Sequence, residues 1–176
     1  MPALHNILTA DTLDVADLAR IHEDSARAPD YLKTLIDEIE RDDPRTQPRA
    51  SWLLLHHATT PAPDSAHAPP PPIPQKHLET AIDILGNSPA WESRLHLCQL
   101  FSRVPCPPDL AEPLHEHLTR LAADKRAFLR AWALTALHHL AKTNPAFKKE
   151  AATTLRAARS DTSKAVQARL RKVLKA

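Results

Sequence analysis

One glycine, Gly86, stands in a chain of 176 residues. A chain of this length with average usage would contain about 12. Tight hairpin turns need residues with positive φ, a conformation that glycine adopts at the lowest cost. The scarcity of glycine therefore argues against an all-β fold. It also excludes the glycine-rich phosphate-binding motifs GxGxxG and GxxxxGK[ST].

The rest of the composition favours helices. Alanine and leucine, both good helix formers, supply 54 of the 176 residues. Apolar residues recur at helical spacing nearly everywhere outside two proline-rich stretches. We expect Asp30 to cap a helix, Gly86 to end one as its C′ residue, and Pro89 to take the first helical position of the next. The predicted helices span residues 12–23, 30–43, 48–59, 75–85, 89–101, 110–121, 128–140, 147–158 and 166–174.

The sequence indicates one helical-repeat domain, residues 1–176, interrupted by a connector. Residues 61–74 contain seven prolines, which predicts an extended, polyproline-II-like segment. No run of 18 apolar residues occurs, and no secretory signal is expected, so we predict no membrane contact. Cys98 and Cys106 are read as free thiols of a cytoplasmic protein, with Cys98 in the core.

Charge is distributed unevenly along the chain. Residues 1–119 hold 9 Lys and Arg against 18 Asp and Glu, and residues 120–176 hold 14 against 3. This split predicts an anionic partner for the C-terminal part, although the cations would also suit solvated helix faces. The candidate binding residues on this basic face are Lys125, Arg126, Lys164, Arg171, Lys172 and Lys175.

The three tryptophans recur at a nearly constant period. Trp52, Trp91 and Trp132 are separated by 39 and 41 residues, and each lies in the second helix of a predicted helix pair. Asp124 and Asp161 begin two further matching segments: an aliphatic residue follows each Asp by five positions. Arg130 comes next in the first segment, where the second has Gln167.

This pattern resembles the second helix of HEAT repeats, whose period is roughly 40–47 residues. The resemblance is good over residues 107–176, moderate over 75–104 and weak over 30–60. It implies an all-α, right-handed superhelix of about four helix pairs, in which Arg130 pairs with Asp161 or Asp124 of the repeat motif. The recurring tryptophans are expected to be packing positions in such a stack.

Two helices near the C-terminus have clear expected faces. Phe128 should face the interior of the predicted 128–140 helix, with His138, His139 and Lys142 facing water. Leu174 should share the apolar face of the last helix with Val166 and Leu170.

No set of residues predicts catalysis or a metal site. The histidine pairs His56–His57 and His138–His139 point in different directions on a helix, and no histidines have the i, i+4 spacing that favours zinc. An acidic cluster is expected to be a solvated helix end with room for a basic partner. Its members are Asp37, Glu38, Glu40, Asp42 and Asp43. We therefore expect no catalytic residue, no metal and no cofactor.

The sequence favours a non-catalytic binding or scaffold role, with a protein as the first expected partner. Nucleic-acid binding by the basic C-terminal repeats is the alternative. Some alkylpurine DNA glycosylases are built from HEAT-like repeats, but no catalytic residue is carried over from them. Head-to-tail self-association of the acidic and basic parts is a third possibility.

Overall fold

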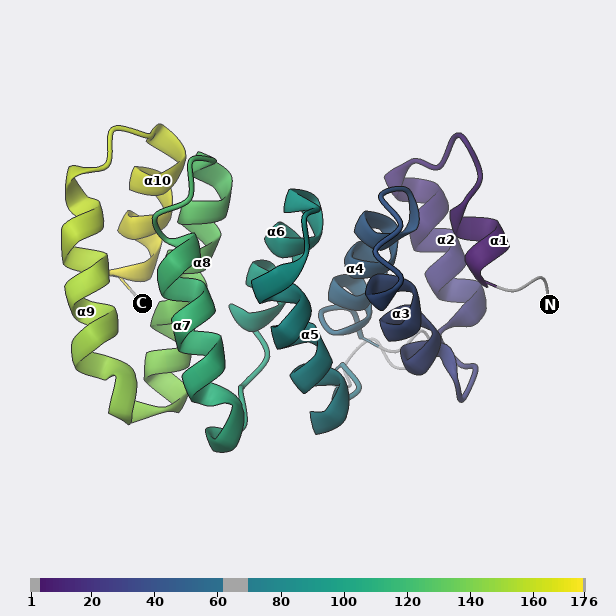
Figure 1. The fold of residues 1–176 in the computed structure, drawn as a ribbon, viewed down its shortest axis with the longest axis horizontal. Coiled ribbons are helices and arrows are strands. Elements are labelled where there is room, and N and C mark those ends of the chain that lie inside the picture. Colours follow the sequence, from purple (N-terminus) through teal and green to yellow (C-terminus); the bar gives the residue numbers. More distant parts are fainter. Residues whose placement is uncertain (1–3, 62–69, 176) are drawn as a thin grey trace. The chain divides into compact units, whose positions relative to one another are not determined.

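The computed structural model describes residues 4–61 and 70–175. Within these ranges the chain is helical and forms no strand, which confirms the all-α class (Figure 1). The α-helices are α1 (Leu4–Leu8), α2 (Val15–Ser25), α3 (Tyr31–Glu40), α4 (Thr46–His57), α5 (Gln75–Asn87), α6 (Trp91–Phe101), α7 (Ala111–Leu121), α8 (Ala127–Thr143), α9 (Lys148–Ala157) and α10 (Lys164–Val173). Single 3₁₀ turns precede α7 and lie on either side of α9: η1 (Pro108–Leu110), η2 (Pro145–Phe147) and η3 (Ala158–Ser160).

Each predicted helix is present, but the helix ends differ from the prediction in three places. Gly86 lies inside α5, and Ser88 caps that helix in an extended conformation, so the expected C′ glycine is wrong. Pro89 lies before α6, which begins at Trp91. Asp30 does occupy the N-cap position of α3, but its side chain makes no capping hydrogen bond. The first helix, α1, was not predicted.

The left-handed backbone conformation occurs at an aspartate. Asp42, just after α3, has φ of 56° and accepts a hydrogen bond from the Gln47 side chain at 3.1 Å. Asp and Asn tolerate this conformation better than most residues, because a short polar side chain can bond locally. The chain therefore makes this turn without a glycine.

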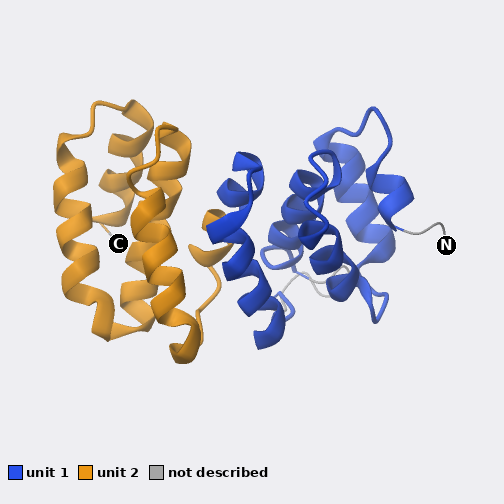
Figure 2. Ribbon diagram, in the orientation of Figure 1, with its two compact units in different colours: residues 1–96 blue, residues 97–176 orange. Residues whose placement is uncertain are grey.

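The chain divides into two compact units, residues 1–96 and residues 97–176 (Figure 2). The single repeat domain expected from the sequence stays a prediction. In unit 1, α3 packs against α4, while α1 and α2 also pack on α4 and α5 packs on α3. Leu35 and Ile39 of α3 and Leu53 and Leu54 of α4 are fully buried there. The apolar stripes of the two helices thus form the centre of this unit.

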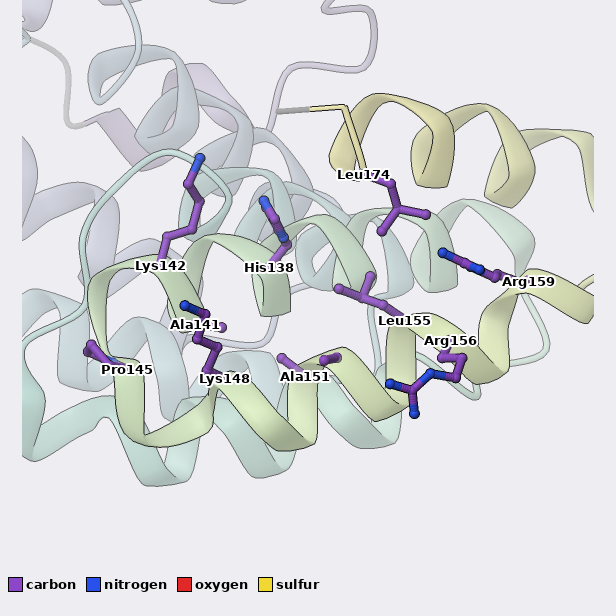
Figure 3. Close-up of a pocket in the computed structure, with 11 residues that line it drawn as sticks. His138, Ala141, Lys142, Pro145, Lys148, Ala151, Leu155, Arg156, Arg159 and Leu174 are labelled. Atoms are coloured by element: carbon purple, nitrogen blue, oxygen red, sulfur yellow. The ribbon is translucent and has the colours of Figure 1, made fainter.

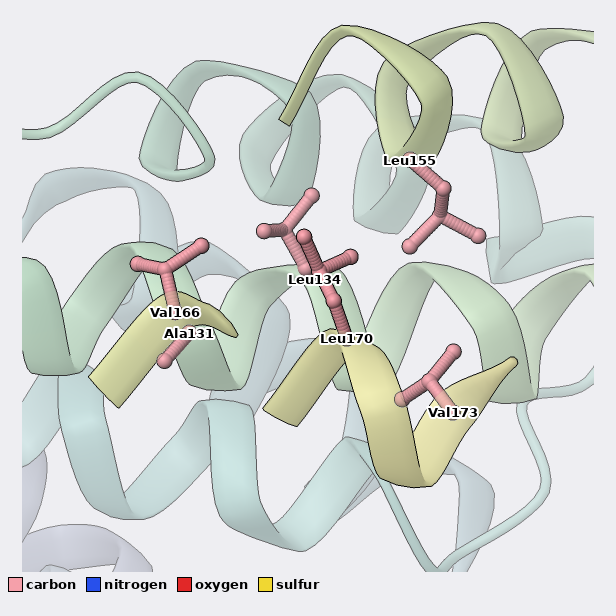
Figure 4. Packing of buried hydrophobic residues seen from close by; sticks show 6 residues of the cluster. All are labelled: Ala131, Leu134, Leu155, Val166, Leu170 and Val173. Atoms are coloured by element: carbon pink, nitrogen blue, oxygen red, sulfur yellow. The ribbon is translucent and has the colours of Figure 1, made fainter. Parts of the chain in front are cut away.

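In unit 2, the long helix α8 is the centre. It packs against α7, α9 and α10, which explains why its apolar positions lie nearly all round the helix. Ala131 and Leu134 of α8 meet Leu155 of α9 and three α10 residues in one buried cluster (Figure 4). Those α10 residues are Val166, Leu170 and Val173. Each buried leucine of this kind contributes about 1.5–3 kcal/mol of burial free energy.

Two expected interior residues are exposed instead. Phe128 is 62% exposed and Leu174 is 50% exposed. Phe128 lies in the first turn of α8, and Leu174 follows the last residue of α10. Helical periodicity assigned both to an apolar face, but at a helix end the neighbouring elements do not cover that face.

The proline-rich connector is described only in part. Residues 62–69 of the predicted 61–74 segment lie outside the described residues, and 70–74 form no helix. Cys98 and Cys106 form no disulfide, as predicted, and Cys98 is buried as expected; Cys106 is buried as well, which the sequence did not predict. No helix in the described residues is long and apolar enough to cross a membrane.

Candidate binding groove

A groove lies on the surface of unit 2, along α9. It has a volume of about 510 Å³ and is walled by the C-terminal half of α8, by α9 and by Leu174 (Figure 3). The residues lining it are His138, Ala141, Lys142, Pro145, Lys148, Ala151, Ala152, Leu155, Arg156, Arg159 and Leu174. We refer to this set as the α9 groove.

The ends of the α9 groove are basic. Lys142 and Lys148 lie at one end and Arg156 and Arg159 at the other (Figure 3). None of the described residues that line the groove is acidic. Glu150 is the acidic residue of α9, and it faces away, with its carboxylate 3.5 Å from Nε2 of His115 on α7. The groove therefore presents positive charge without a counter-charge in its own wall.

The floor between these ends is small and apolar. Ala141, Ala151 and Leu155 are buried, while Ala152 and Leu174 are exposed to solvent. His138 also lies in the floor, and burial lowers its pKa, followed by the nearby Lys142 and His139. The imidazole is thus neutral near pH 7, so the positive charge of the groove comes from its lysines and arginines.

The predicted basic face does not coincide with this groove. Arg130, in the first turn of α8, bonds to Asp161 just before α10, so both helices begin at the same end of unit 2. Lys125, Arg126 and Lys164 lie at that end, whereas Arg171 and Lys172 lie in the last turn of α10 and Lys175 follows that helix. None of the six predicted residues lines the groove. We call these six the helix-end cations: Lys125, Arg126, Lys164, Arg171, Lys172 and Lys175.

The sequence did carry a signal for the groove. Lys148, Arg156 and Arg159 follow one another at spacings of eight and three, which places them on one side of α9 and of the turn η3 that continues it. Ala151, Ala152 and Leu155 fall on the same side. The combination of cations with small apolar residues on one helix side distinguishes this surface from a solvated face.

The ion pair expected for Arg130 is confirmed. The Arg130 guanidinium donates to both carboxylate oxygens of Asp161, over 2.7 Å from Nε and 3.1 Å from Nη2. This hydrogen bonding lowers the pKa of Asp161 and raises that of Arg130. Arg130 reaches Asp124 only at its backbone carbonyl, 2.8 Å from Nη1.

Matching hydrogen bonds recur at the start of α10. The side chain of Gln167 donates to the carbonyl of Asp161 over 2.8 Å, as Arg130 does to the carbonyl of Asp124 six residues before it. Each aspartate also accepts a hydrogen bond from the backbone N–H two residues later. The two segments that resemble each other in sequence thus share a local hydrogen-bond pattern.

The three tryptophans are half-buried and do not belong to the fully buried core. Trp132 is covered by the guanidinium of Arg169, whose Cζ lies 3.3 Å from the ring centroid. Trp52 stacks on His56 with the ring centroids 4.8 Å apart. Both therefore pack, as expected, but through polar and cationic partners. Trp91 differs in register, because it is the first residue of α6.

A ring cluster fills the region between α2, α3 and α4 in unit 1. Nδ1 of the buried His22 lies 3.1 Å from the Tyr31 hydroxyl. The His22 ring also contacts His56 and His57, with centroids 4.9 and 5.4 Å apart. Burial, followed by these two neighbours, lowers the pKa of His22 to about 4. Burial also lowers the pKa of His56 and His57, so the cluster is neutral near pH 7.

The acidic cluster is not wholly a solvated helix end. Glu38 is 2% exposed, and its carboxylate lies 2.8 Å from Nδ1 of His5 and 3.3 Å from Nε of Arg41. Asp37 pairs with Lys33 at 2.6 Å. The expectation of a free acidic surface at this helix end is therefore wrong for Glu38. Two cations already satisfy part of the cluster.

No group of three or more His, Cys, Asp or Glu residues in the described ranges is arranged to hold a metal ion. Comparison with known proteins gives no match: no family model, no curated protein and no solved structure is similar to this chain. The fold and the groove therefore define the protein only as an all-helical protein with a basic surface groove.

Proposed function

We propose that this chain is a non-catalytic binding protein whose unit 2 binds an acidic protein partner. One observation carries the proposal: nine exposed cations of unit 2 have no side-chain partner among the described residues. They are Lys125, Lys148, Lys149, Arg156, Arg159, Lys164, Arg171, Lys172 and Lys175. Unit 2 has 15 Lys and Arg against 6 Asp and Glu. Such an unbalanced surface attracts an oppositely charged partner and raises its association rate.

Two further inferences accompany this proposal. The shared hydrogen bonds at Asp124 and Asp161 support HEAT-like pairing of the helices, which gives a rigid scaffold for side chains. Cys98 and Cys106 form no disulfide, which favours a reducing compartment and agrees with a cytoplasmic location.

Binding of a fluorescein-labelled 20-residue polyglutamate peptide, followed by anisotropy, tests the proposal. We expect the full chain to bind at low salt and to lose affinity steeply as salt rises. Reversing Lys148, Arg156 and Arg159 to Glu should weaken binding about tenfold or more. Reversing the exposed Lys76 of unit 1 is the control and should leave the affinity within twofold. No binding at low salt contradicts the proposal.

Nucleic-acid binding is the second candidate, and Phe128 favours it. This exposed ring lies two residues after Arg126, at the end of unit 2 where Lys125 and Lys164 also lie. An exposed aromatic beside cations is an arrangement on which a base can stack. Trp132 does not offer such a surface, because Arg169 already covers one face of its ring.

Single-stranded and duplex DNA, labelled and titrated in the same way, separate the two candidates. If nucleic acid is the partner, Phe128→Ala should weaken single-strand binding about fivefold or more while duplex binding changes little. DNA that binds more weakly than polyglutamate at every salt concentration favours the protein partner.

A further inference from the structure

The α9 groove has the length of a helix rather than of a compact ligand. Its lining residues run from Lys148, the first residue of α9, to Arg159 in the following turn η3, a distance of roughly 16 Å at 1.5 Å per residue. That distance equals three turns of a helix lying alongside. A groove of this length and of about 510 Å³ accommodates one row of side chains from such a helix.

The chemistry of the floor suits close approach of a helix. Ala141, Ala151 and Ala152 have no side chain beyond Cβ, so a partner backbone can come near. Leu155 and Leu174 offer apolar surface in the same stretch, and Leu174 is half-exposed. Exposed apolar side chains in a concave surface are typical of an interaction site.

The charges of the α9 groove indicate which residues a bound segment should have at its two ends. Lys142 and Lys148 lie at one end of the groove, and Arg156 and Arg159 lie at the other, with the apolar floor between them (Figure 3). Nucleic acid would place its phosphates evenly along the groove, over the alanines as well. A chain with acidic residues at both ends and apolar ones in the middle matches the observed order.

From this arrangement we propose that the α9 groove binds an amphipathic helix of about three turns from an acidic protein partner, with apolar residues in its middle and Asp or Glu at both ends. The inference rests on the proposed function, because it names the site and the form of the acidic partner. Apolar side chains at i, i+3 or i+4, and i+7 would enter the floor, and the terminal carboxylates would meet the four cations.

Two variants separate docking in the groove from attraction by charge. Ala152→Arg fills the floor and Leu174→Lys removes an apolar contact, and each adds one positive charge. Docking predicts weaker binding of an acidic helix, whereas simple charge attraction predicts stronger binding. Both residues are exposed, so both variants should keep the fold, which circular dichroism and a thermal melt would verify.

The probe is a labelled 18-residue peptide with leucines at i, i+4 and i+7 between Glu-rich ends. A peptide of the same composition in scrambled order is its control. We expect the ordered peptide to bind about tenfold more tightly than the scrambled one and to gain helix on binding. Ala152→Arg and Leu174→Lys should each weaken its binding about fivefold or more. Lys125→Glu, Lys164→Glu and Arg171→Glu together should change it less than Lys148→Glu, Arg156→Glu and Arg159→Glu together.

Each other outcome has a distinct meaning. If both peptides bind equally and Ala152→Arg binds as tightly as the unchanged chain or tighter, the groove is not the docking site, although the proposed function stands. If neither set of charge reversals changes the affinity for either peptide, the proposed function fails as well. If a 20-bp duplex displaces the peptide and shows the same loss with Ala152→Arg, nucleic acid occupies the groove and the proposal is overturned.

Discussion

Individual side chains show how polar groups hold unit 2 together beside its apolar core. Arg130 makes two hydrogen bonds to Asp161 and two more to the carbonyls of Asp124 and Lys125. Planar guanidinium and carboxylate groups match in this geometry, and both side chains are largely shielded from water. The pair therefore fixes the segment before α10 against the start of α8.

We expect Arg130→Ala and Asp161→Asn each to lower the free energy of unfolding by about 1–3 kcal/mol, because each leaves the partner's charge or hydrogen bonds unmatched. In a double-mutant cycle by urea denaturation, the coupling energy should be at least about 0.5–1 kcal/mol. Arg130→Lys should recover only part of the loss, because an ammonium group cannot make the paired hydrogen bonds. Additive effects of the two single substitutions would contradict a direct pair.

Helices were the features that the sequence predicted best. Apolar spacing located α3, α4, α5, α7 and α8 because each has a continuous buried stripe. The wrong predictions lie at helix ends, as with Gly86 and Phe128. At a helix end, the packing of neighbouring elements outweighs the conformational preference of the local residues. The α9 groove could not be predicted as a cavity, because its walls come from α8, α9 and Leu174. The sequence pattern of a single helix does not determine how these separate elements pack.

The ring cluster on α2, α3 and α4 makes the stability of unit 1 sensitive to pH. The pKa of His22 is about 4 in the folded chain and about 6.5 when the ring is exposed to water. Folding therefore favours the neutral ring. The contribution of the His22 ring to the free energy of unfolding is complete above pH 6.5 and decreases as the pH falls toward 4.

We expect protonation of His22 alone to lower the free energy of unfolding by about 2 kcal/mol when the pH falls from 7 to 5. The buried rings of His56 and His57 should add to this loss. His22→Asn keeps an amide near Nδ1 for the Tyr31 hydroxyl but cannot be protonated in this range. Urea denaturation at several pH values should show a smaller pH dependence for this variant. If the free energy of unfolding changes equally with pH in both proteins, His22 is not the source of the pH dependence.

Across the whole molecule, charge is separated between the units. Unit 1 has 8 Lys and Arg against 15 Asp and Glu, while unit 2 has the reverse excess. The net charge of unit 1 in one copy is thus complementary to that of unit 2 in another. Contacts of this heterologous kind do not close by symmetry unless the rotation happens to form a ring.

Sedimentation velocity at low and high salt tests this association. We expect larger species at about 20 mM salt and monomer at about 0.5 M, because salt of that concentration screens exposed charges within a few ångströms. Lys164→Glu, Arg171→Glu and Lys175→Glu together should give monomer at low salt as well. A sedimentation coefficient that does not change with salt would exclude head-to-tail association.

The two buried cysteines offer a way to time the opening of unit 2. Cys98 is 0% exposed and Cys106 6% exposed, and burial raises the pKa of the Cys106 thiol to about 11. A thiol reagent can therefore reach them only while the surrounding helices are transiently separated. At high reagent concentration the rate of modification becomes the rate of opening, and at low concentration it gives the equilibrium between closed and open forms. The chain thus contains its own kinetic reporter, at two points in the same unit, without any introduced label.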